Sequence, residues 1–116
     1  MIDSKEKGKR FERWCCKWWH QITGRTVERS AALAPHMDAR GVDLIGTGSW
    51  LVQCKSIERS IDLHTILDRM PLNGGVNVVL HKRSKRGTVV SMRLDDFAHI
   101  LSRLEDDTAR PLLGAN

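Results

Sequence analysis

Three polar residues interrupt two short, otherwise apolar runs near the middle of the 116-residue chain. Asp43 lies within residues 42–45, and Gln53 and Lys55 lie within residues 51–55. A carboxylate and an ammonium group that share one face of a small protein are costly to hold there, and they are typical of a site that binds or transforms a polar ligand. The alternative is a polar sheet face that simply contacts solvent.

The spacing of the two runs places these side chains relative to one another. Both runs are rich in β-branched and aliphatic residues, and they flank a turn that contains glycine. Such a pattern predicts an antiparallel β-hairpin. With the turn centred on Gly48, Asp43 lies opposite Gln53. The two-residue period of a strand then puts Asp43, Gln53 and Lys55 on one face.

An amphipathic helix is expected at the start of the chain, over residues 3–22. Its apolar residues recur at helical intervals: Phe11, Trp14, Cys15, Trp18 and Ile22. Asp3, three residues before a glutamate, has the spacing of a capping box. Trp14 and Trp18 are expected in the core, which leaves Trp19 on a second face for a subunit contact or a stacked base.

The remaining elements follow from turn residues and periodicity. The sequence predicts a strand at residues 25–29, followed by a loop at 30–41 that lies over a functional surface. After the hairpin it predicts a helix at 60–70, capped by Ser60. Two strands follow, at 76–80 and 88–92, joined by a basic loop at 81–87, and a last helix begins at about residue 95. This order predicts an α/β or α+β class with a mixed sheet flanked by helices. A chain of this length fits one domain, here residues 1–104, followed by a polar C-terminal tail at residues 105–116.

Charge and composition limit the classes of partner. Lysine and arginine outnumber aspartate and glutamate by 19 to 14, and the net charge of +5 favours a polyanion such as nucleic acid or an anionic membrane. No stretch reaches the roughly 20 apolar residues of a membrane span, and no signal-peptide pattern is visible, so we expect a cytoplasmic protein without a membrane partner. The three cysteines form no C-x-x-C pair and the five histidines are dispersed, which argues against a disulfide framework or a zinc site.

The order of several short motifs resembles the PD-(D/E)xK nuclease superfamily. The motifs are GKRFER at residues 8–13, RS at 29–30, GVD at 41–43 and QCK at 53–55. Within this superfamily the chain is most similar to archaeal-type and phage Holliday-junction resolvases, over residues 5–104. Val42 replaces the usual proline, and Gln53 replaces the acidic residue in a Q-x-K form that resembles the Mrr-type restriction endonucleases. The resemblance implies a restriction-endonuclease-like α/β fold with a central mixed β-sheet flanked by helices.

This resemblance also implies roles for individual residues. The expected catalytic residues are Glu12, Asp43, Gln53 and Lys55. Glu12, Asp43 and Gln53 would bind Mg²⁺, for which Mn²⁺ substitutes, through two carboxylates and a neutral carbonyl oxygen. Lys55 would position or deprotonate the attacking water, or offset charge on the transition state. The expected DNA contacts, for which solvated surface is the alternative, are Lys9, Arg10, Arg13, Arg29, Ser30, Arg40, Lys82, Arg83, Lys85 and Arg86.

The function that the resemblance implies is a metal-dependent, structure-selective DNA endonuclease, in particular a homodimeric Holliday-junction resolvase of a bacterial, archaeal or phage-infected cell. A two-fold axis suits this reaction, because two symmetric cuts in a four-way junction need two symmetric active sites. Two alternatives stay open. One is an Mrr-like restriction or repair endonuclease that cuts duplex DNA. The other is a catalytically inactive nuclease-fold protein, in which Gln53 marks a decayed site and DNA is bound without cleavage.

Overall fold

Helix α1 (Ser4–Thr23) opens the part of the chain that the computed structural model describes, residues 3–106. Asp3 caps this helix, because its carboxylate accepts a hydrogen bond of 2.8 Å from the backbone N–H of Glu6. Gly24 ends it in the left-handed conformation, with φ at 77°, and its N–H bonds back to the His20 carbonyl. The predicted first helix is therefore confirmed.

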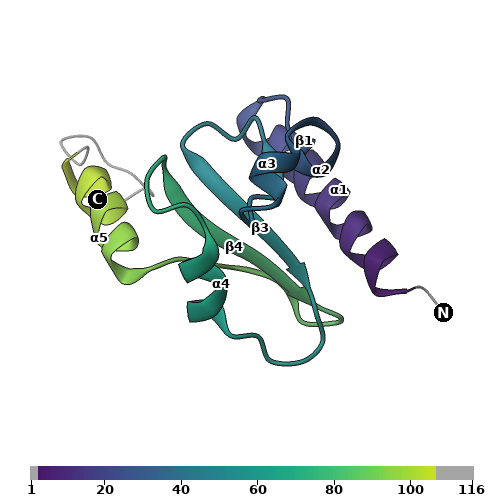
Figure 1. Ribbon diagram of the computed structural model, residues 1–116. Helices are drawn as coiled ribbons and strands as arrows, with labels where there is room; N and C mark the ends of the chain where they lie inside the picture. Colours follow the sequence, from purple (N-terminus) through teal and green to yellow (C-terminus); the bar gives the residue numbers. More distant parts are fainter. Residues whose placement is uncertain (1–2, 107–116) are drawn as a thin grey trace.

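Within the described residues the strands form two separate sheets (Figure 1). β1 (Glu28–Arg29) and β2 (Leu44–Ile45) form a short antiparallel pair. The second sheet has the order β3 (Trp50–Ser56), β4 (Val76–Arg83) and β5 (Gly87–Ser91), with β3 parallel to β4 and β4 antiparallel to β5. The remaining helices are α2 (Ser30–Leu33), α3 (Pro35–Asp38), α4 (Leu63–Arg69) and α5 (Leu94–Asp106). A mixed sheet with helices confirms the α/β class.

The hairpin predicted for residues 42–45 and 51–55 is wrong as a strand pair. β2 pairs with β1, and β3 pairs in parallel with β4. The connection from β3 to β4 passes through α4, and apolar strands of this kind do not reveal by composition whether they pair in parallel or antiparallel. The two runs are nevertheless adjacent at one point, because the Asp43 N–H donates to the Val52 carbonyl at 2.7 Å.

Two predicted boundaries change because of local capping and helix formation. Residues 30–41, predicted as a loop, contain α2 and α3, each four residues long. α4 begins at Leu63 and not near Ser60. Asp62 is its cap, since the Asp62 carboxylate accepts hydrogen bonds from the N–H and the hydroxyl of Thr65.

Three further boundaries shift by a few residues. The strand predicted at 25–29 spans only Glu28–Arg29. β4 continues past residue 80 to residue 83, so that the turn to β5 narrows to residues 84–86. Residues 105 and 106, predicted to begin the polar tail, belong to α5. The rest of that tail, residues 107–116, lies outside the described residues.

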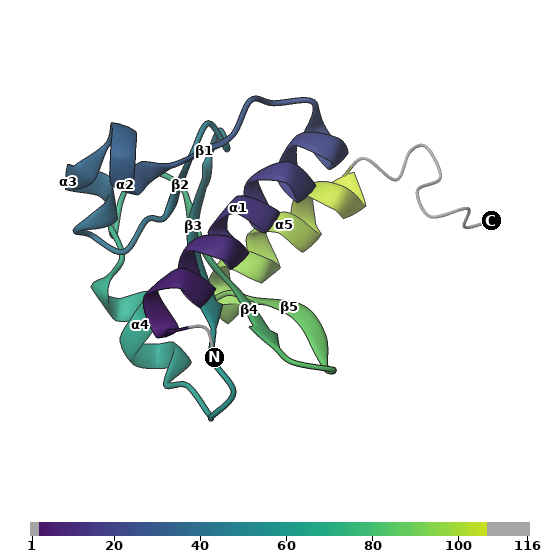
Figure 2. The ribbon, with the colours of Figure 1, turned by 90° about the vertical axis from the view of Figure 1, so that its right-hand side faces the viewer.

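The three-stranded sheet has a hydrophobic cluster on each face, with α1 on one side and α4 on the other (Figure 2). The α1 residues in the core are Phe11, Cys15 and Trp19. Trp19 is 8% exposed, whereas Trp14 and Trp18 are 48% and 38% exposed, so the predicted core positions of Trp14 and Trp18 are wrong. Phe11, Cys15 and Trp19, spaced four residues apart, form the helix face that packs on the sheet. Trp14 and Trp18 lie on the neighbouring face, which does not.

Helix α5 has an amphipathic pattern, but none of its residues is buried. It stands at one end of the molecule, with the sheet between it and α1 (Figure 1). An ion pair between Arg93 and Asp68 joins the start of α5 to α4. No helix within residues 3–106 is long and apolar enough to cross a membrane.

Candidate active site

Asp43 occupies the open edge of β3. This strand is the outer one of its sheet, so the backbone groups on one side have no strand partner. The Asp43 N–H donates to the Val52 carbonyl at 2.7 Å, and the Cys54 N–H donates to Oδ2 of Asp43, also at 2.7 Å. The first bond fixes the Asp43 backbone against β3 and the second fixes its side chain, and only 7% of the residue is exposed.

Ser30 supports the chain just before Asp43. It is fully buried, its N–H donates to the Asp43 carbonyl at 2.8 Å, and its hydroxyl donates to the Val42 carbonyl at 2.5 Å. Its side chain therefore has no surface to offer to DNA. We assign Ser30 a structural role in place of the predicted DNA contact.

The four side chains expected to be catalytic converge on one open pocket of about 740 Å³, which we call the active-site pocket. Glu12 comes from α1, Asp43 from the segment before β2, and Gln53 and Lys55 come from β3. The Glu12 carboxylate accepts a hydrogen bond of 2.8 Å from Nε of Arg29, and both side chains are mostly buried. This charge-assisted bond holds Glu12 at the pocket wall.

Burial raises the pKa of Asp43 to about 7. The hydrogen bond from the Cys54 N–H opposes this shift, the negative charges of Glu12 and Asp38 add to it, and the positive charge of Lys55 opposes it. A bound cation would favour the charged form of the carboxyl group. The pocket therefore holds carboxylates whose mutual repulsion a cation would relieve.

Gln53 turns its amide nitrogen toward Asp43. The Nε2 atom donates to Oδ2 of Asp43 at 3.3 Å. The Oε1 atom lies over Gly41, 2.7 Å from where a Cβ atom on that residue would stand. Gly41 has φ at 82°, a left-handed backbone conformation that favours glycine. The absence of a Cβ atom at this residue also leaves room for the Gln53 oxygen.

The residues present fit a Mg²⁺ ion through two carboxylates. Asp43 and Glu12 offer hard oxygen donors in an open pocket with room for water ligands, which is the coordination that Mg²⁺ prefers. Gln53 would offer its oxygen only after its amide rotates by half a turn. Within residues 3–106, no three histidine, cysteine, aspartate or glutamate side chains are grouped so that they could hold a metal ion.

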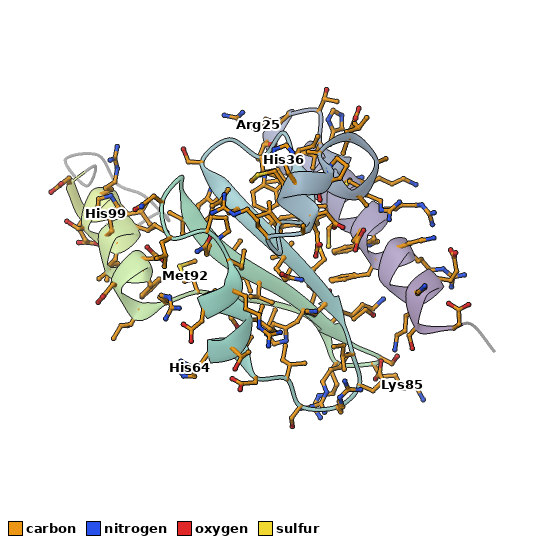
Figure 3. All side chains as sticks on the ribbon, in the orientation of Figure 1. Arg25, His36, His64, Lys85, Met92 and His99 are labelled. Carbon is orange, nitrogen blue, oxygen red and sulfur yellow. The ribbon has the colours of Figure 1, made fainter. Side chains whose placement is uncertain are left out.

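The predicted DNA contacts other than Ser30 fall into three sets by their position on the surface. Two line the active-site pocket, Lys9 and Arg29. Three are exposed outside the pocket, Arg10, Arg13 and Arg40. Four are exposed on the hairpin of β4 and β5, Lys82, Arg83, Lys85 and Arg86. Lys85 lies at the tip of this hairpin, at the other end of the molecule from His99 on α5 (Figure 3).

Glu58 ties the basic hairpin to the rim of the active-site pocket, which it lines. Its carboxylate forms an ion pair of 2.7 Å with Lys7 and accepts a hydrogen bond of 3.0 Å from the Ser84 N–H. The hydrogen bonds from Lys7 and Ser84 lower the pKa of Glu58 to about 2. The basic residues of the hairpin therefore lie next to the pocket.

Several pocket residues were not predicted from the sequence: Lys7, Asp38, Glu58 and Arg59. Asp38 comes from α3, in a segment without periodicity that was expected only to cover a functional surface. Lys7 and Glu58 are 51 positions apart, and no local pattern links them. Their contact depends on the way α1 packs on the sheet.

The chain matches no protein-family model, and no curated protein or solved structure is similar enough to it to count as a match. The fold and the site define a mixed α/β protein that places carboxylate, amide and lysine side chains in one open pocket.

Proposed function

We propose that this protein is a Mg²⁺-dependent DNA endonuclease with a restriction-endonuclease-like fold, which acts as a homodimer on four-way junctions. The observation that carries the proposal is the convergence of the four expected catalytic side chains on the active-site pocket. The net charge of +5 and the basic residues at the pocket rim favour a polyanionic substrate. Mn²⁺ is expected to replace Mg²⁺.

Hydrolysis of a phosphodiester requires a positioned water molecule and stabilisation of charge on the phosphoryl oxygens. Asp43 and Glu12 would hold Mg²⁺, which supplies Lewis-acid stabilisation of that charge and lowers the pKa of water. Lys55 lines the same pocket, and its side chain has no hydrogen bond or ion pair among residues 3–106, so its ammonium group is free to orient the water or a phosphoryl oxygen. Arg29 positions Glu12. No covalent protein intermediate is needed.

A cleavage assay tests this function. A labelled four-way junction and a linear duplex with the same arm sequence are incubated with Mg²⁺, Mn²⁺ or EDTA. We expect metal-dependent cleavage of the junction by the wild type and a loss of roughly 100-fold or more in Asp43→Asn, with junction binding retained. Glu28→Gln is the matched control, because Glu28 is exposed on β1 and does not line the active-site pocket, and this variant should cleave like the wild type.

Two outcomes of this assay would change the assignment. Cleavage by Asp43→Asn at the wild-type rate would refute the active site. Preference for the linear duplex over the junction would favour an Mrr-like restriction or repair endonuclease.

A DNA-binding protein without activity is the second candidate, and the orientation of Gln53 favours it. The Nε2 atom of Gln53 donates a hydrogen bond to the Asp43 carboxylate. In this orientation the amide gives Asp43 a hydrogen-bond donor and does not offer its oxygen to a metal ion. Junction binding in EDTA together with no cleavage in any divalent metal would support this candidate over the endonuclease.

Two exposed apolar surfaces support the homodimer. Phe97, Leu101 and Leu104 on α5 are between 45% and 49% exposed, and Trp14 and Trp18 are exposed on α1. The two helices lie at opposite ends of one chain, so α5 cannot cover its own α1 (Figure 1). A second copy can bring its α5 onto α1, and a two-fold axis makes this contact reciprocal.

The charges of the two helices favour the same contact. α1 has six basic and two acidic side chains, for a net charge of +4, whereas α5 has one basic and four acidic side chains, for a net charge of −3. Contact between α1 of one copy and α5 of the other therefore brings opposite charges together around the apolar residues.

Sedimentation measures the oligomeric state. The wild type should be a dimer, and Leu101→Glu should be a monomer, because the glutamate would place a charge in the apolar contact. Leu72→Glu is the control, since Leu72 is 83% exposed and lies after α4, outside both apolar surfaces. A wild-type monomer at every concentration, or a Leu101→Glu dimer, would refute this interface.

A further inference from the structure

A second, smaller pocket of about 220 Å³ adjoins the active-site pocket. Lys55, Ile57 and Arg59 line both pockets, so the two hollows meet at these residues. The β4 residues His81 and Arg83 also line the second pocket, as do Ser60, Ile61 and Leu63. Lys55 and His81 are register partners in the parallel pair of β3 and β4, and Arg83 follows His81 by one strand period on the same face.

The second pocket is cationic and contains no compensating carboxylate. Its lysine and arginine residues are Lys55, Arg59 and Arg83, and none of the described residues that line it is acidic. Glu58, the acidic residue next to Arg59, uses its carboxylate on Lys7 and on the hairpin. Lys55 is half-buried, and Arg59 and Arg83 are exposed at the mouth of the pocket. Like charges gathered in one hollow are stabilised by a bound anion.

The hydrogen bonds around the pocket leave its guanidinium groups available. Nε of Arg83 donates to the backbone carbonyl of Glu58 at 2.8 Å, which fixes the base of the guanidinium group. Neither the terminal nitrogens of Arg83 nor the Arg59 side chain has a hydrogen bond or ion pair within residues 3–106. Guanidinium groups bind phosphate oxygens in a two-pronged geometry, so these two side chains favour a phosphate group over a simple halide-like anion.

The size and the remaining lining of the pocket limit the ligand further. Its volume lies below the range of about 300–1,000 Å³ for pockets that bind drug-sized molecules, which favours a small group of a larger ligand. Ile57, Ile61 and Leu63 add an apolar side, suited to the carbon atoms of a sugar. The chemistry is that of a phosphate attached to a sugar.

We propose that the second pocket binds a backbone phosphate of DNA next to the phosphate that is cleaved. This inference rests on the proposed function, because Asp43 and Lys55 define where the cleaved phosphate lies. A DNA strand that passes Lys55 would place one of its phosphates in each pocket. The substrate must then extend at least one phosphate beyond the scissile bond on the side of Arg59.

The test combines a protein variant with DNA in which one phosphate is uncharged. Junctions carry a single methylphosphonate at each backbone position in turn, and binding is titrated in EDTA, where cleavage does not interfere. For the wild type we expect a loss of roughly fivefold or more when the phosphate in the second pocket is neutral. In Arg59→Gln, neutralising the phosphate at that one position should weaken binding no further, because the arginine that contacts it is already absent. The DNA affinity of this variant should also depend less on salt, with a slope of log affinity against log salt that is smaller by about one.

Arg69→Gln is the matched control, because Arg69 is exposed on α4 and lines neither pocket. It should respond to every methylphosphonate like the wild type. If Arg59→Gln also does so at every position, the subsite is refuted, whether or not the protein cleaves DNA. Coupling between Arg59 and one phosphate in a protein that does not cleave would support the subsite and refute the endonuclease.

Inorganic phosphate provides a second probe, independent of DNA. It should shift the NMR signals of the His81 ring in the wild type and shift them less in Arg59→Gln, because His81 lines the pocket. A shift with free phosphate, combined with no effect of any methylphosphonate, would show a site for a free anion and overturn the assignment to DNA.

Discussion

The metal-free protein should become less stable as the pH rises through neutrality, because of Asp43. Burial raises the pKa of this carboxyl group from 3.8 to about 7 in the folded protein. Between these two values the folded protein holds a proton that the unfolded chain has released, so the free energy of unfolding falls with increasing pH. The contribution of Asp43 is complete below about pH 4 and is lost as the pH rises through about 7.

The size of this effect follows from the two pKa values. Their difference, at about 1.4 kcal/mol for each pH unit, corresponds to roughly 4 kcal/mol. Asp43→Asn removes the titration and keeps the shape of the side chain. Both hydrogen bonds to the carboxylate, from Gln53 and Cys54, reach the single atom Oδ2, which the asparagine carbonyl oxygen can replace. The variant should therefore be more stable than the wild type at about pH 8, and the difference should shrink by roughly 3 kcal/mol at about pH 5, since the two proteins become equal only below about pH 4.

Urea unfolding, followed by tryptophan fluorescence in EDTA at one protein concentration, measures this difference between about pH 5 and pH 8. The comparison of the two proteins isolates Asp43. Other titrating groups are present in both, including His81, whose pKa burial lowers. Glu28→Gln, on the exposed side of β1, should follow the wild type at every pH. The reasoning is refuted if the stability difference between the wild type and Asp43→Asn does not change with pH, or if it changes in the opposite direction.

Three further substitutions probe the neighbours of Asp43. Lys55→Ala should lower the cleavage rate far more than junction affinity, and equal losses in both would make Lys55 an ordinary phosphate contact. Metal affinity measured by calorimetry should fall in the order Gln53→Glu, wild type, Gln53→Ala, and an unchanged affinity across the series would exclude coordination by residue 53. Gly41→Ala should lower the free energy of unfolding by about 1–2 kcal/mol, because φ at 82° strains any side chain. A urea midpoint equal to that of the wild type would contradict this account.

The residues of the site could be predicted more completely than the sheet that holds them. Asp43, Gln53 and Lys55 were expected close together through a hairpin, and they do line one pocket. The hairpin itself is wrong, because β3 pairs with β4 and α4 lies between them in the chain. Alternation of residue types constrains the face on which a side chain lies, but the choice of strand partner depends on distant packing that no local pattern records.

The same limit applies to the first helix. Trp14 and Trp19 both lie on faces with helical periodicity, so the period alone does not decide which face meets the sheet. The caps, in contrast, depend on neighbours within one turn: the Asp3 cap was predicted correctly, and the predicted Ser60 cap is displaced by two residues, to Asp62. Local rules therefore predicted where α1 begins, whereas its orientation depends on the sheet.

The position of Asp43 on the outer edge of β3 has a consequence for solubility. An unpaired edge strand is a template for the addition of strands from other molecules, and charged side chains on the edge oppose this process. Asp43 both accepts the Cys54 N–H and places an acidic group there. Asp43→Val would release that N–H and remove the acidic group, while it raises the β propensity of the residue. We expect this variant to aggregate, and light scattering at about pH 8, above the pKa of Asp43, would detect it. If Asp43→Val stays as soluble as Asp43→Asn, the edge is protected by its other neighbours.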